Sequence, residues 1–75
     1  MSSSLERVFA VIGHGRRARA RDERSGEQLG YSEVTGSRTT YYAPSGRRLG
    51  SAVADGPYLR LVDAAERLVG LYRRA

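Results

Sequence analysis

The sequence has no cysteine and no tryptophan, only one histidine (His14), and no lysine, because all 13 basic residues are arginine. Without cysteine, no disulfide can staple the fold and no thiolate can bind a metal or act as a nucleophile. One histidine cannot make a zinc site alone. We therefore expect a fold held by packing alone, without a metal or a cofactor.

Long hydrophobic runs are also missing. The longest apolar stretch near the start, residues 8–12, is too short for a signal peptide and far too short for a membrane span. No nucleophile elbow or Cys/His pair is present, and Gly13 and Gly15 lack the rest of a dinucleotide or phosphate-loop pattern. These absences predict a cytoplasmic protein that is not an enzyme and does not enter a membrane.

What the sequence does have is a 20-residue spacing. Gly30, Gly50 and Gly70 are each preceded by Leu or Val, and Ser25-Gly26 recurs as Ser45-Gly46. A fixed period in this range is typical of repeated supersecondary units that bury their apolar faces together. Glycines inside strands indicate bulges, bends or a close approach of backbone.

The expected fold class is all-β: an antiparallel meander of about three 20-residue β-hairpins plus an N-terminal strand over residues 5–12. The pattern does not decide between an open sheet, a barrel and a small sandwich. The 75 residues form one expected domain, with a frayed start at 1–4 and units near 5–15, 16–35, 36–55 and 56–75. A helix over residues 63–74 is the alternative, because Asp63 and Glu66 fit a capping box; the repeat register favours a third hairpin.

Residues 41–50 resemble one unit of the tyrosine–aspartate (YD) repeats of Rhs-type proteins, which run Tyr-Asp, two residues, Gly-Arg, then an apolar position. Here Tyr42, Gly46 and Arg47 match, and Ala43 replaces the aspartate. The first copy keeps an acid at Asp22, and the third keeps Asp63 and Arg67 but lacks the glycine. The resemblance implies β-hairpin repeats. It does not imply the large toxin-enclosing shell of that family, which needs far more chain.

The strongest functional signal is basic, with a net charge of +5. In an extended strand Arg17, Arg19 and Arg21 project from one face, about 6.6 Å apart. Guanidinium forks in such a row suit phosphates or carboxylates. Arg47 and Arg48 extend the candidate site if neighbouring strands bring them close, and tyrosines interleave with it. The candidate binding residues are Arg17, Arg19, Arg21, Arg47, Arg48, Tyr31, Tyr41 and Tyr42.

The favoured function is a small binding module that mediates protein–protein interaction or self-assembly, since Arg and Tyr dominate interface hot spots. Its expected partner is an acidic protein surface or a second copy joined through open sheet edges. A small inhibitor of a nucleic-acid machine, of the kind carried by phages and mobile elements, belongs to the same class. The alternative is direct DNA or RNA binding, in which arginines contact phosphates and tyrosines stack on bases.

Overall fold

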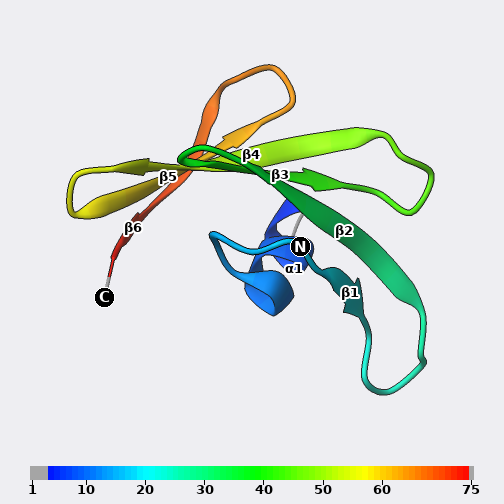
Figure 1. Ribbon diagram of the computed structural model, residues 1–75. Coiled ribbons are helices and arrows are strands. Elements are labelled where there is room, and N and C mark those ends of the chain that lie inside the picture. Colours follow the sequence, from blue (N-terminus) through cyan, green and yellow to red (C-terminus); the bar gives the residue numbers. More distant parts are fainter. Residues whose placement is uncertain (1–3, 75) are drawn as a thin grey trace.

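The computed structural model describes residues 4–74 and contains one short helix and six strands (Figure 1). The helix α1 spans Ser4–Ile12. The strands are β1 (Arg19–Arg21), β2 (Gln28–Thr35), β3 (Arg38–Tyr42), β4 (Arg48–Asp55), β5 (Tyr58–Asp63) and β6 (Leu68–Arg73). Each strand pairs antiparallel with the next along the chain, so the sheet order is β1-β2-β3-β4-β5-β6. The predicted antiparallel meander of hairpins is confirmed.

The sheet is open. β1 and β6 are its two edges and do not pair with each other, so the chain adopts neither a closed barrel nor a sandwich. The sheet curls, and α1 lies against one of its faces (Figure 1), where it contacts β1 to β4. We call this the helix face and the opposite side the outer face. Within residues 4–74 no helix covers the outer face, and only the β5–β6 turn folds over part of it.

The predicted N-terminal strand is wrong, because residues 4–12 form a helix. Leu5, Val8 and Ile12 are buried against the sheet, and their spacing of three and four residues is the helical period. The β-branched and aromatic content of this segment suggested a strand. The helix forms because it buries Leu5, Val8 and Ile12 together against the sheet. Of the expected frayed start, Ser4 begins the helix, and residues 1–3 lie outside the described part of the chain.

The alternative C-terminal helix is also wrong, since β6 pairs with β5 in its place. Asp63, the residue that suggested a helix cap, instead closes a tight turn. One of its carboxylate oxygens accepts hydrogen bonds from the backbone N–H groups of Ala65 (2.9 Å) and Arg67 (3.0 Å). An aspartate that bonds backbone a few residues ahead serves a turn as well as a helix start, which is why the sequence signal was ambiguous.

The 20-residue period produces one β-bulge in each of three hairpins, β1–β2, β3–β4 and β5–β6. The strand register shifts so that Leu29, Leu49 and Val69 are each the extra residue opposite the partner strand. Bulges bend a strand and increase its twist. Three of them at equal spacing explain the regular curl of the sheet and the glycine that follows each one.

Two of these glycines form the seat of the helix. A Cβ at Gly50 would lie 2.2 Å from the Val62 carbonyl oxygen and 2.7 Å from a Leu5 methyl carbon. A Cβ at Gly30 would lie 2.2 Å from the Tyr42 carbonyl oxygen and 3.0 Å from a Val8 methyl carbon. The first two repeats therefore need glycine because strands and helix approach each other too closely for a side chain.

The period also places a left-handed residue in each long hairpin turn. Gly26 (φ 74°), Gly46 (φ 94°) and Glu66 (φ 63°) occupy the same repeat position. A non-glycine residue in this region costs about 1 kcal/mol or more. The third copy has glutamate in place of glycine with the same conformation, and the Glu66 side chain contacts Arg38 and Arg48.

Tyr41 is at the centre of the core and is fully buried. Its ring packs edge-on against Phe9, with centroids 5.9 Å apart and an interplanar angle of 84°. Its hydroxyl donates a hydrogen bond to the Gly13 carbonyl. The other core residues are Leu5, Val8, Ile12, Ala20, Ala52 and Leu61.

Candidate binding surfaces at the two sheet edges

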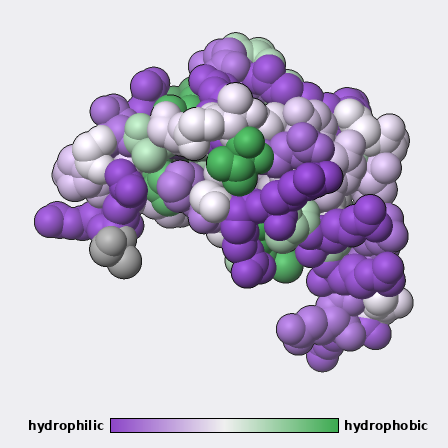
Figure 2. Space-filling model, in the orientation of Figure 1, coloured by the Kyte–Doolittle hydropathy of each residue, from purple (hydrophilic) through white to green (hydrophobic). Residues whose placement is uncertain are grey.

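The arginines before and within β1 share one side of the chain. Arg17, Arg19 and Arg21 are exposed, whereas Ala20 between them is buried and Ala18 is partly buried against the core. Only residues 19–21 belong to the strand, so β1 is shorter than the expected stretch from 16 to 21. The β1–β2 hairpin, at the lower right in Figures 1 and 2, has a largely hydrophilic surface.

Ser32 holds the segment before β1 in place and thereby positions Arg17. Its buried hydroxyl donates to the Arg16 carbonyl (2.7 Å) and accepts from the Ala18 N–H (3.0 Å). The Ser32 N–H in turn donates to the Ala18 carbonyl (2.8 Å). These bonds extend the ladder beyond β1, so Arg17 follows the alternation of Arg19 and Arg21 although it precedes the strand.

A groove of about 520 Å³ runs along β1 and the neighbouring part of β2. Its lining consists of Arg17, Ala18, Arg19, Ala20, Arg21, Gln28, Gly30, Tyr31, Ser32, Glu33 and Pro44. Three arginines face a single carboxylate, that of Glu33. Within residues 4–74, the side chains of Arg17 and Arg19 make no hydrogen bond or ion pair, and Arg21 donates only to the Gly26 carbonyl (3.3 Å).

A row of four predicted site residues crosses the outer face. Arg19 lies opposite Tyr31, Tyr31 opposite Tyr42, and Tyr42 opposite Arg48, on β1 to β4. The two tyrosine rings stack, with centroids 5.1 Å apart and an interplanar angle of 17°. At a strand spacing of about 4.8 Å, the row spans about 14 Å. The sheet therefore brings together residues that are up to 29 positions apart in the sequence.

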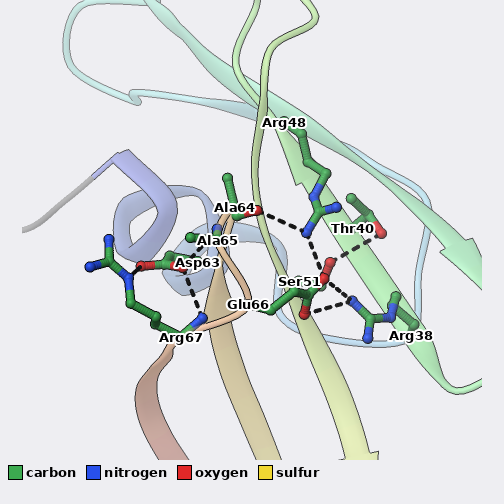
Figure 3. Close-up of polar contacts among 9 residues, drawn as sticks. All are labelled: Arg38, Thr40, Arg48, Ser51, Asp63, Ala64, Ala65, Glu66 and Arg67. Atoms are coloured by element: carbon green, nitrogen blue, oxygen red, sulfur yellow. Dashed lines mark hydrogen bonds and ion pairs between the residues drawn. The ribbon is translucent and has the colours of Figure 1, made fainter.

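The charge of Arg48, at the β4 end of this row, is neutralised by an ion pair. The β5–β6 turn folds over the outer face, and Glu66 reaches Arg48 (2.8 Å) and Arg38 (3.2 Å), as Figure 3 shows. The hydrogen bond from Arg48, and then the charge of Arg38, lower the pKa of the Glu66 carboxyl. Arg48 also donates to the Ala64 carbonyl (3.5 Å). The structure thus places Arg48 in an ion-pair cluster rather than among the free arginines.

Two other candidates do not join the groove. The prediction that Tyr41 is a binding residue is wrong. Adjacent strand residues face opposite sides of a sheet, so Tyr42 lies on the outer face and Tyr41 in the core. Tyr41 is therefore not available to a ligand. Arg47 is exposed in the β3–β4 turn, outside the lining of the groove.

The Glu66 cluster predicts an acid dependence of stability. Its folded-state pKa lies below the ordinary value of 4.5, so the ion pairs stabilise the fold above that pH and are lost as pH falls further. We expect Glu66→Gln to lower the thermal midpoint at pH 7 and to converge with the wild type in acid. Glu27→Gln is the control, since Glu27 forms no ion pair within residues 4–74. If Glu66→Gln lowers the thermal midpoint by the same amount at pH 7 and in acid, the ion pairs of Glu66 do not stabilise the fold.

A second surface, at β6, was missed by the sequence analysis. Large apolar side chains on this edge strand are exposed: Leu68 (57%), Val69 (41%), Leu71 (57%) and Tyr72 (40%). By strand register, Leu68 and Leu71 lie on the outer face and Tyr72 on the helix face, where its ring contacts Phe9 at 5.0 Å. The sequence signal that could have found this surface is the run of apolar residues from Leu68 to Tyr72.

In the part of the chain that the structure describes, no helix is long and apolar enough to cross a membrane. The same residues hold no group of three His, Cys, Asp or Glu side chains close enough to bind a metal ion. No known protein family matches the sequence, and comparisons with curated proteins and with solved structures find no similar chain. The two edges of the sheet are therefore the features that point to a function.

Proposed function

We propose that this chain is a non-enzymatic protein-interaction module that assembles with a second copy of itself through β6. The observation that carries the proposal is the open β6 edge, where four large apolar side chains are 40–57% exposed. Within residues 4–74 no strand pairs with this edge. An edge strand with apolar side chains on both faces and no proline or inward charge is a template for pairing with another strand.

The backbone of β6 favours such pairing. The Arg74 N–H donates to the Pro57 carbonyl (2.7 Å), toward β5. Because N–H and C=O groups alternate in direction along an antiparallel strand, those of Leu71 and Arg73 point to the open edge. Antiparallel pairing about Leu71 places Leu71 beside Leu71 of the second copy and Arg73 beside Val69. A second copy thus fits without opposing two arginines, despite the net charge of +5.

Sedimentation equilibrium tests this proposal. We expect the mass of the wild-type chain to rise toward that of a dimer with concentration. Leu71→Lys should weaken association about thirtyfold, because about 1 kcal/mol of half-buried leucine is lost from each copy. Val11→Lys is the control, since Val11 is a comparably exposed (49%) apolar residue on α1. A monomer at all concentrations, or equal dimerisation of Leu71→Lys and the wild type, contradicts the proposal.

A further inference from the structure

We propose that the groove along β1 binds single-stranded nucleic acid, with Arg17, Arg19 and Arg21 on the phosphates and Tyr31 against a base. This site lies at the opposite edge of the sheet from β6. The inference therefore does not depend on self-assembly, and the two can fail separately.

The charge distribution and the groove together select these three arginines. Elsewhere in residues 4–74, four arginines pair with acids: Arg7 with Asp22, Arg67 with Asp63, and both Arg38 and Arg48 with Glu66. The other arginines of this range without an acidic partner do not line the groove: Arg16, Arg24, Arg47, Arg60, Arg73 and Arg74. Arg17 and Arg19 have no such partner, and Arg21 donates only to a carbonyl. Three arginines without an acidic partner, in line along a groove, form a track for a chain of anionic groups.

The aromatic residues distinguish nucleic acid from an acidic peptide. Tyr31 lines the groove, lies opposite Arg19, and is backed on its other side by the stacked ring of Tyr42. The backing ring fixes the orientation of Tyr31. A fixed aromatic ring beside a row of guanidinium groups is the arrangement that holds a base while the backbone is bound. A peptide carboxylate gains nothing from that ring.

The shape of the site favours a single strand over a duplex. The groove is a concavity of about 520 Å³ between an edge strand and the β3–β4 turn at Pro44. Such a slot admits one extended backbone with its bases turned inward, whereas a duplex presents its phosphates on a wide convex surface with the bases stacked inside. The row toward Arg48 does not extend the track, because Glu66 already occupies that arginine.

Fluorescence anisotropy with labelled oligothymidine and oligouridine over a range of salt concentrations tests the site. Three phosphate contacts predict a log–log salt slope of about −2, at about −0.7 per contact for a single strand. Arg19→Gln should reduce the slope by about 0.7. Arg48→Gln, the matched control, should leave it unchanged. The proposal is overturned if the wild type does not bind the oligonucleotides, or if Arg19→Gln and Arg48→Gln reduce the salt slope equally.

The Tyr31 variants test the base contact. Tyr31→Leu should weaken binding at least about fivefold, whereas Tyr31→Phe, which keeps the ring, should bind as the wild type does. Tyr58→Leu is the control, because Tyr58 is an exposed tyrosine on β5, away from the groove. A labelled duplex and a polyglutamate peptide complete the assay. Binding of either one as tightly as the single strand, or binding unaffected by Tyr31→Leu in a folded variant, overturns the proposal.

Discussion

Replacing Gly50 by alanine is expected to destabilise the fold by about 4 kcal/mol. A methyl group there would lie 2.2 Å from the Val62 carbonyl oxygen on one side and 2.7 Å from Leu5 on the other. Neither can yield cheaply, because the first is backbone in a paired strand and the second belongs to the buried helix stripe. For a domain of this size the total stability is about 4–11 kcal/mol. Urea unfolding followed by circular dichroism should show a much lower midpoint or no cooperative transition.

Gly70→Ala is the matched control for this experiment. Gly70 occupies the same position in the third repeat, but the nearest atom to an added Cβ belongs to the ring of Tyr72, at 2.9 Å. Tyr72 is 40% exposed on an edge strand and its ring can move, although it also contacts Phe9 of α1. We expect a cost of about 1 kcal/mol, typical of an ordinary substitution. Equal urea midpoints for Gly50→Ala and Gly70→Ala would contradict the close contact of α1 and β5 with Gly50.

Tyr41→Ala is expected to cost about 3–5 kcal/mol, the range for removal of a large buried aromatic ring. Tyr41 is fully buried, packs against Phe9 and supplies the hydrogen bond to Gly13. Tyr42→Ala, one residue later on the outer face, loses a half-buried ring and should cost far less. Unfolding midpoints in denaturant compare the two directly. Greater destabilisation by Tyr42→Ala would contradict the placement of Tyr41 in the core and Tyr42 on the outer face.

Tyr41→Phe isolates the hydroxyl. Burial raises the pKa of the Tyr41 hydroxyl above its ordinary value of 10. The folded state therefore favours the protonated form, so this contribution is complete below about pH 10 and is lost as pH rises further. We expect Tyr41→Phe to cost about 1 kcal/mol at pH 7. Its stability should fall less steeply in alkali than that of the wild type, as thermal midpoints at pH 7 and above pH 10 can show.

The sequence predicted the hairpins well, because their signals are local. Turn glycines such as Gly46 and the alternation around Ala20 depend on backbone geometry and strand period, and neither needs distant contacts. The glycine period indicated bulges, bends or a close approach of backbone, and the structure has bulges at Leu29, Leu49 and Val69. The contact of α1 with Gly30 and Gly50 could not be predicted, because it forms only when the first two repeats lie side by side.

The candidate site was predictable in part for the same reason. Arg17, Arg19 and Arg21 follow one local alternation, and the sequence placed them on one side. The row from Arg19 to Arg48 depends on the register of three strand pairs, which bulges shift by a residue. Nor could the sequence show that Glu66 engages Arg48 across the outer face. The exposure of β6 follows from the absence of a pairing strand in residues 4–74, which no local pattern encodes.

Amide hydrogen exchange at β6, measured by NMR at low and high protein concentration, tests the proposed assembly most directly. The N–H groups of Leu71 and Arg73 point to the open edge, whereas that of Tyr72 points to β5. The account predicts that exchange at Leu71 and Arg73 slows as concentration rises, while exchange at Tyr72 stays slow throughout. Fast exchange at Leu71 and Arg73 at every concentration would contradict assembly through β6.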